Sequence, residues 1–331
     1  MSHELTTRTD GTVEFAYLAS DGAPWHGLGQ PMTAGQSIDE WRTAAGMDWA
    51  IQKSKIRYAT GHGQGPDAWR TLDDQLVLLR SDTKDALGVV SNRYQVVQPA
   101  QVLEFFRDVA KAGGLELSAA GTIYGGKRFW ATAKIGDAAP TSVRDRIGGY
   151  LLLSTSADGS LATEARLTSI RVVCKNTLQF ARADAKPALR VSHRSVFDPK
   201  AVQAAMGLNT AAWDAFKHNL VRLANTSVHE EQAAEIVAGL FATAPGQDGR
   251  DKARETAGFK KVLSLFNGAG MGARLDGVFG TANGVLQAVT EYSDHHVRAR
   301  SDEHRFVASQ WGGGADLKQR AWDDLMALVA A

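Results

Sequence analysis

Aromatic and cationic side chains are interleaved in one stretch of this chain, from residue 115 to residue 135. An aromatic ring offers a surface on which any base can stack, worth roughly 1–3 kcal/mol per base, while Lys and Arg pair with phosphates. The pattern therefore favours binding to single-stranded nucleic acid. The candidate binding residues of this stretch are Tyr124, Lys127, Arg128, Trp130 and Lys134.

A basic run follows this stretch. Between residues 166 and 194 the chain has seven Lys or Arg residues and one acidic residue, Asp184, which gives a local net charge of +6. Cations that neutralise phosphates release counterions, so binding through them weakens as the salt concentration rises. The candidate phosphate-binding residues of the run are Arg166, Arg171, Lys175, Arg182, Lys186, Arg190 and Arg194.

Two β-hairpins are expected to position the aromatic and cationic side chains. In the first, a three-residue loop at 125–127 places the apolar side chains on one face, because a slip of one residue would move every side chain across the sheet. A competing interpretation is that another element covers Tyr124 and Trp130. The face expected to meet solvent carries Ser118, Thr122, Tyr124, Arg128, Trp130, Thr132 and Lys134.

The second hairpin is expected to turn at Asp158-Gly159, a strong signal for a two-residue turn between alternating strands. In that register Leu152 and Leu167 share one face, and Leu151 lies on the other. Both faces carry leucines, so other elements are expected to cover both sides of these strands.

An amphipathic helix is expected from about Thr168 to Arg182. Apolar residues there recur with the i, i+3, i+4 spacing of a helix, and the cations fall on another face. The β-branched run from Ile170 to Val173 leaves a longer strand as the alternative for the first part of this segment.

The other elements indicate the fold class. Strands are expected at 47–60, 75–82 and 86–97, and helices behind Ser37 and from Pro99. Strands grouped without regular β-α-β alternation predict an α+β fold with an antiparallel sheet, two β-hairpins and packed helices, followed by a mostly helical C-terminal part. The predicted domains are 1–197, an α+β core with an N-terminal arm, and 198–331, a mostly helical region packed on the core or on a neighbouring subunit.

Signals for other chemistry are weak. The glycine-rich run at 268–272 lacks the Lys-Ser/Thr of a phosphate-binding loop and follows no strand. The group Asp294, His295, His296 and His304 has no standard metal-ligand spacing, so neither a metal nor another cofactor is expected. An enzyme would have to use His26 or His193 with a carboxylate distant in the sequence.

Composition limits the remaining possibilities. The formal charge of the 331 residues is only +1, so a nucleic-acid-binding surface must be a local patch. The one cysteine, Cys174, excludes an internal disulfide framework and a cysteine-based zinc site, and fits a reducing cytoplasm. No apolar run approaches 18 residues and the N-terminus lacks the apolar region of a signal peptide, so we expect a cytoplasmic protein with no membrane partner.

Several segments together resemble a known family: FAYLASDGAPWHGLG, LGVVSNRYQVVQ, TSIRVVCKNTL, GTANGVLQAVTEYSDHH, and ASQWGGG with the Lys that follows it. The chain resembles phage/plasmid-like proteins that carry a domain of unknown function. This resemblance implies genes on phages, plasmids and other mobile elements, without established catalytic residues. The order of strands, hairpins and helix is also similar to single-strand annealing proteins of the Redβ, Erf and Rad-fifty-two type, which form rings or helical filaments.

The leading hypothesis is a non-enzymatic homo-oligomer, a ring or filament, that binds single-stranded DNA and anneals it during phage or plasmid recombination. The first alternative is a protein-interaction factor, such as an inhibitor of host defence or restriction, which uses its helical C-terminal part. The second alternative is an uncharacterised enzyme.

Overall fold

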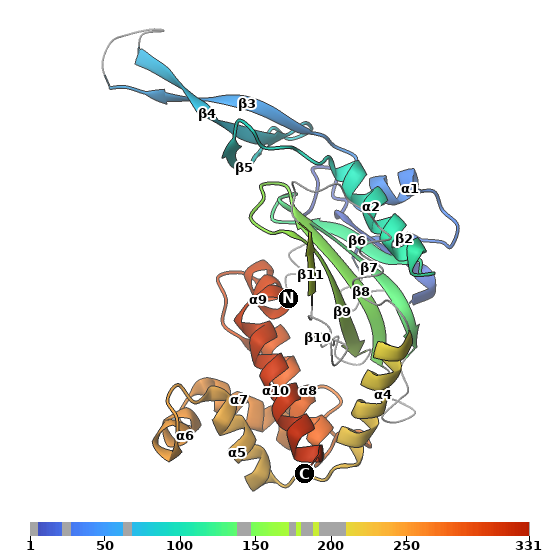
Figure 1. The fold of residues 1–331 in the computed structure, drawn as a ribbon, viewed down its shortest axis with the longest axis vertical. Helices are drawn as coiled ribbons and strands as arrows, with labels where there is room; N and C mark the ends of the chain where they lie inside the picture. Colours follow the sequence, from blue (N-terminus) through green and yellow to red (C-terminus); the bar gives the residue numbers. More distant parts are fainter. Residues whose placement is uncertain are drawn as a thin grey trace.

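The computed structural model describes residues 6–21, 28–61, 68–137, 147–171, 177–179, 188–191 and 210–330. The protein has a mixed α+β fold, in which two β-sheets precede a largely helical C-terminal part (Figure 1). This architecture confirms the predicted fold class.

An eight-stranded sheet forms the centre of the molecule. Its strand order is β10-β9-β8-β7-β6-β1-β2, and β11 pairs with β9 beside β10. The described pairs are antiparallel except β1 with β2. The strands are β1 (Phe15–Leu18), β2 (Gln30–Met32), β6 (Leu117–Ile123), β7 (Arg128–Asp137), β8 (Ile147–Ser156), β9 (Thr163–Arg171), β10 (Thr177–Gln179) and β11 (Ala188–Val191).

One face of this sheet forms the main core with α2 (Pro99–Ala112). Pro99 lies in the first turn, where a missing N–H costs no helix hydrogen bond, as predicted. Phe106 of α2 and Phe129 of β7 belong to the same cluster of buried apolar side chains. Next to α2 lies α1 (Ile38–Ala44), which begins at the expected N-cap, Ser37, with a complete capping box.

A second sheet of three strands leaves the body of the molecule as a projecting arm (Figure 1). Its order is β3-β4-β5, with β3 (Ile51–Ala59), β4 (Trp69–Arg80) and β5 (Ala86–Ser91). The three predicted strands exist, but β4 begins at Trp69, earlier than the predicted residue 75, and β5 ends at Ser91, earlier than the predicted residue 97. The two longer strands of this sheet form the β3–β4 hairpin. Leu78 and Arg80 are buried at the base of this hairpin, and the side chains toward its tip are more exposed.

The C-terminal part packs helices against one another and against the sheet. Trp213 of α4, Phe216 of α4 and Trp322 of α10 stack in series, with ring centroids 5.5 and 5.0 Å apart, and so join these two helices. The helices are α4 (Thr210–Asn225), α5 (Glu230–Phe241), α6 (Gln247–Arg254), α7 (Ala257–Ser264), α8 (Ala282–Glu291), α9 (Asp302–Trp311) and α10 (Gly313–Ala330), and π-helical turns extend α7 through Leu265–Ala269 and α8 through Tyr292–His296.

The register predicted for the first hairpin is wrong. Ile123 pairs directly with Arg128 around a four-residue turn at 124–127, in which Tyr124 has a φ of 57° and the two glycines also have positive φ. A bulge between Leu117 and Ala119 returns Leu117 to the core side. Thr122 therefore shares a face with Phe129, not with Trp130, and its hydroxyl donates to the buried carboxylate of Glu14.

The two-residue turn at Asp158-Gly159 is also wrong. Leu151 pairs with Leu167, because Ser156 Oγ donates to the Leu161 carbonyl at 3.1 Å, accepts from the Leu161 N–H at 2.9 Å, and so closes a longer loop. Both faces of these strands are nevertheless covered, as predicted, since Leu151 and its neighbour Leu152 are both buried.

The amphipathic helix predicted from Thr168 to Arg182 is wrong where the structure describes it. Residues up to Arg171 continue β9, and 177–179 form β10, which pairs back on β9. The β-branched residues of this segment suit a sheet, and the open edge of β9 offers the backbone partners that a local helix would otherwise have supplied. The alternative of a longer strand holds through Arg171.

Candidate nucleic-acid interface

Trp130 lies on the sheet face opposite to α2. Its ring stacks on Phe15 of β1, with centroids 5.6 Å apart, across the position of Gly121. Gly121 has no room for a side chain, because a Cβ there would lie 2.8 Å from the Glu14 carbonyl oxygen. Phe306 of α9 lies over Trp130, with centroids 6.4 Å apart. The expectation that this face meets solvent is therefore wrong, and the competing interpretation of a covered face describes the structure.

Tyr124 and Arg128 meet at the end of the first hairpin. The Arg128 guanidinium lies 5.3 Å from the centroid of the Tyr124 ring, a cation–π arrangement. His304 of α9 contacts the same ring edge to face, with centroids 5.6 Å apart. The structure thus brings together three predicted site residues, Tyr124, Arg128 and Trp130, but beneath α9.

The two predicted lysines of this hairpin differ in their surroundings. Lys127 is exposed in the turn. Lys134 is half-buried, and its Nζ lies 3.4 Å from the carboxylate of Asp21. Lys127 is therefore the more accessible cation on this hairpin.

Arg166 is held inside the protein. Its guanidinium forms an ion pair with Glu164 at 2.7 Å, where the Glu164 side chain is 1% exposed. Its Nη1 also donates to the carbonyl oxygen of Gln310, near the C-terminal end of α9, at 3.3 Å. A cation at that position suits the partial negative charge of a helix C-terminus, so Arg166 helps to attach α9 to the sheet.

Three buried N–H donors near α9 have no hydrogen-bond partner among the described residues: Arg128 Nη1, Trp130 Nε1 and Trp311 Nε1. An unmade hydrogen bond of this kind costs about 1–3 kcal/mol per group. Within the part of the chain that the structure describes, these three donors therefore carry the cost of an unmade hydrogen bond.

The other predicted cations have no described side-chain surroundings. Arg171 lies in β9 and Arg190 in β11, where Arg190 pairs with Glu164 in the strand register. The remaining four, Lys175, Arg182, Lys186 and Arg194, lie outside the described residues, as do His26, Cys174 and His193.

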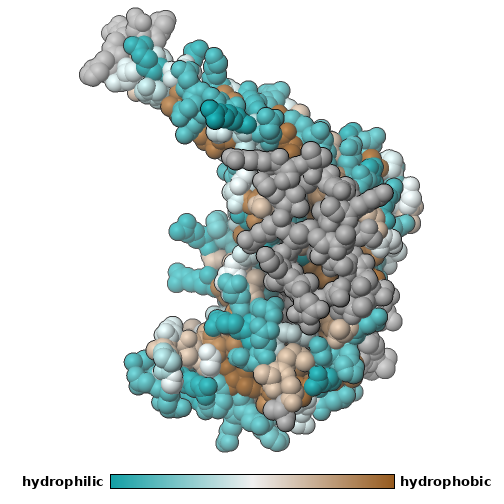
Figure 2. Space-filling model, in the orientation of Figure 1, coloured by the Kyte–Doolittle hydropathy of each residue, from teal (hydrophilic) through white to brown (hydrophobic). Residues whose placement is uncertain are grey.

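The projecting hairpin carries a second set of aromatic and cationic side chains, which the sequence reasoning did not single out. Tyr58 and Trp69 are each 51% exposed, which is uncommon for such large rings. Figure 2 shows hydrophilic surface along most of this arm. We define the arm surface as these six exposed residues of β3 and β4: Lys53, Lys55, Arg57, Tyr58, Trp69 and Arg70.

Strand geometry arranges the arm surface. Lys53, Lys55 and Arg57 alternate along β3, so they project from one face about 6.6 Å apart. Trp69 pairs with Ala59 and shares that face, whereas Tyr58 and Arg70 pair with each other on the opposite face. The signal that could have revealed this surface was the alternating Lys-x-Lys-x-Arg in a segment already expected to be a strand.

A buried ionic network anchors the base of the arm. Arg80, at the end of β4, donates to both carboxylate oxygens of Glu14, at 2.6 and 3.2 Å, and to the Gly125 carbonyl at 3.2 Å. Its guanidinium lies 4.2 Å from the centroid of the Trp49 ring. Burial alone would lower the pKa of Arg80, but hydrogen bonds to Asp82 and Glu14 outweigh burial and raise it. The arm is thus fixed to the N-terminal segment and to the first hairpin.

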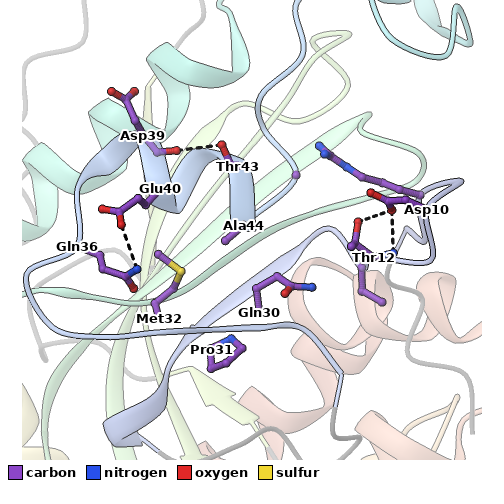
Figure 3. Close-up of a pocket in the computed structure, with 13 residues that line it drawn as sticks. Asp10, Thr12, Gln30, Pro31, Met32, Gln36, Asp39, Glu40, Thr43 and Ala44 are labelled. Carbon is purple, nitrogen blue, oxygen red and sulfur yellow. Dashed lines mark hydrogen bonds between the residues drawn. The ribbon is translucent and has the colours of Figure 1, made fainter.

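A groove of about 620 Å³ lies beside α1, lined by the N-terminal segment and β2 (Figure 3). Two of its carboxylates accept hydrogen bonds from residues nearby in the sequence: Asp10 accepts from Thr12 N at 2.9 Å, and Glu40 accepts from Gln36 at 3.2 Å and from Ser37 N at 2.7 Å. These local hydrogen bonds close turns and cap α1, so we assign the groove no ligand.

The glycine-rich run at 268–272 also makes an internal hydrogen bond, because the Met271 N–H donates to the Glu291 carboxylate at 2.9 Å. Asp294, which follows the same helix, forms a buried ion pair with Lys318 of α10 at 2.7 Å. Burial lowers the pKa of Lys318. In the part of the chain that the structure describes, no group of three potential metal-ligating side chains converges.

A family model matches a large part of the chain, which includes the segments LGVVSNRYQVVQ, TSIRVVCKNTL and GTANGVLQAVTEYSDHH quoted above. The model of a domain of unknown function (DUF932) matches residues 86–311. The chain belongs to the DUF932 family. The DUF932 match begins at the first residue of β5 and ends at the last residue of α9, so α9 lies inside the family domain and the β3–β4 hairpin precedes it.

No curated protein and no solved structure matches the chain significantly. Over the described residues, the DUF932 protein contains no helix with the length and hydrophobicity needed to span a membrane.

Proposed function

We propose that this DUF932 protein binds single-stranded DNA as a homo-oligomer and promotes annealing in the recombination of phage or plasmid DNA in the cytoplasm. The observation that carries the proposal is the arm surface. Each face of the projecting hairpin joins a half-exposed ring to exposed positive charge: Trp69 shares a face with the three cations of β3, and Tyr58 shares the other with Arg70.

The charge pattern of the hairpin supports contact with a phosphate backbone. β3 carries three cations and no acidic residue, and Arg70 adds a fourth cation beside Tyr58. Lysines on an edge strand such as β3 can also serve only to prevent pairing with other sheets. The two roles give different results in a DNA-binding assay, since only contact with phosphates makes these cations necessary for binding.

The test is the fluorescence anisotropy of a labelled single-stranded oligonucleotide, titrated with the full chain at low and moderate salt. Lys55→Ala with Arg57→Ala should weaken binding, and should reduce the slope of log affinity against log salt by about 0.7 for each lost phosphate contact. Trp69→Ala should weaken binding at both salt concentrations, because stacking on the ring is lost.

The matched control is Lys252→Ala with Lys260→Ala, which removes the same charge from exposed positions on α6 and α7, at the end of the molecule opposite to the arm (Figure 1). This control should bind as the wild-type protein does. Equal weakening in both double variants would mean that only net charge matters, and it would remove the arm surface from the proposal.

A second candidate function is a protein-interaction factor, such as an inhibitor of host defence or restriction. The observation that favours it is one apolar pair on the three-stranded sheet, where Val89 is 57% exposed and Val77, opposite it on β4, is only half-buried. Under this alternative Val89→Ser would abolish capture of a host protein and leave DNA binding unaffected.

A further inference from the structure

α9 covers the sheet face that carries Tyr124, Arg128 and Trp130, although few of its side chains are buried there. Among its described side chains, only Ser309 and Gln310 are buried; His304 is exposed, and those from Arg305 to Ala308 are half-buried. A segment with few buried contacts opens at low cost relative to the rest of a fold. α9 is therefore weakly held in comparison with the helices behind it.

The described contacts between α9 and the sheet are ones that a nucleic acid strand can replace, whereas Arg305 Nε of α9 donates to the Val297 carbonyl at 2.8 Å within the C-terminal part. His304 and Phe306 place rings against Tyr124 and Trp130, where bases could stack instead. The Gln310 carbonyl oxygen accepts from Arg166, where a phosphate oxygen could accept instead. Two donors on the sheet face beneath α9 that lack partners among the described residues, Arg128 Nη1 and Trp130 Nε1, would gain acceptors from such a strand.

The C-terminal end of α9 allows it to move relative to α10. Gly312 links the two helices, and α10 begins with Gly313 and Gly314; consecutive glycines can absorb large changes in φ and ψ. α10 itself is anchored, through the buried Lys318–Asp294 pair and the stack of Trp322 on Phe216. Movement at the glycines would thus displace α9 and leave α10 in place.

We propose that α9 is a displaceable cover, and that single-stranded DNA takes its place on the face formed by Tyr124, Arg128, Trp130 and Arg166. This inference rests on the proposed function and adds a regulated second contact to the arm surface. In the free protein α9 occupies the face, and the strand must displace it, so the apparent affinity is reduced by the fraction of molecules that are closed.

The experiment locks the cover with a reversible crosslink. Cys174, the chain's one cysteine, is replaced by Ser, and Tyr124→Cys with His304→Cys introduces thiols at two side chains that touch. A short bis-methanethiosulfonate reagent joins the thiols, and a reductant removes it. Anisotropy titrations with the labelled oligonucleotide compare the crosslinked and reduced forms of the same protein, so the loss of Tyr124 is common to both.

The crosslinked form should bind at least about tenfold more weakly than the reduced form. Phe306→Ala should act in the opposite direction and tighten binding about tenfold, because it weakens the closed state. Leu328→Ala, which shortens an exposed apolar side chain on α10, is the matched control and should change nothing.

Equal binding by the crosslinked and reduced forms, or weaker binding by Phe306→Ala, would show that α9 is a fixed part of the fold and would overturn the inference while DNA binding stands. If the wild-type protein binds no single-stranded DNA at low salt, the proposed function fails, and the cover loses its ligand with it. The two failures are therefore distinguishable.

Discussion

Replacing Arg80 with Met should destabilise the protein more than any ordinary surface substitution. Arg80 is 3% exposed in its side chain, Glu14 is 0% exposed, and four further hydrogen bonds or contacts converge on the same guanidinium from Asp82, Gly125 and Trp49. Removing one partner of a buried ion pair leaves an uncompensated charge and typically costs about 3–5 kcal/mol. Thr122 and Arg8 still contact Glu14, so we expect about 3 kcal/mol.

Urea unfolding followed by circular dichroism measures this loss. With a denaturant slope of roughly 3 kcal/mol per molar for a chain of this size, the midpoint should fall by about 1 M. Arg42→Met is the matched control, because Arg42 pairs with Asp39 at the surface of α1 and should contribute no more than about 1 kcal/mol. A loss below about 1 kcal/mol for Arg80→Met would refute the idea that this network anchors the arm.

Two further predictions concern stability. The hydrogen bond from Arg80 lowers the pKa of Asp82 to about 2. A carboxyl whose pKa is depressed in the folded state stabilises the fold above its unfolded pKa, near 3.8, so the free energy of unfolding should fall as the pH is lowered from about 4 to about 2. Asp82→Asn removes this carboxyl and should reduce that fall. Urea titrations at several pH values test this, and an unchanged pH profile in the variant would contradict it. Gly149→Val should cost about 1–3 kcal/mol, because a Cβ at Gly149 would lie 2.7 Å from the Trp213 ring. Thermal unfolding tests this, and a variant with the wild-type melting temperature would show that α4 can shift away from β8.

The elements that depend on local chemistry could be predicted from the sequence. Ser37 and Pro99 identify helix starts because capping and a missing N–H act within one turn, and the strands of the arm follow from their composition. The α+β class followed from the grouping of these elements.

The pairing register of the strands and the covering of sheet faces by other elements could not be predicted, because they depend on residues far apart in the chain. The register of the first hairpin depends on a bulge near Leu117 and on Glu14, which receives the Thr122 hydroxyl from 108 residues away. The segment after Thr168 has a helical spacing of apolar residues, but pairing with β8 decides its structure. Trp130 is covered by Phe306, which no local pattern connects to it.

The candidate site illustrates the same limit. The sequence correctly grouped Tyr124, Arg128 and Trp130 on one surface, since alternation along β7 and the turn bring them together. The solvent exposure of these three side chains could not be predicted from the sequence. The arm surface could not be predicted, because its cations are spread over β3 and β4. Only the projection of this hairpin from the body brings them together as an exposed set.

The role of the arm surface in DNA binding is tested by the salt dependence of single-stranded oligonucleotide binding by the wild-type protein and by Lys55→Ala with Arg57→Ala. We expect tight binding by the wild-type protein that weakens steeply with salt, and a weaker, less salt-dependent binding by the variant. Identical titration curves for the two proteins, or no binding by the wild-type protein at low salt, would contradict this role.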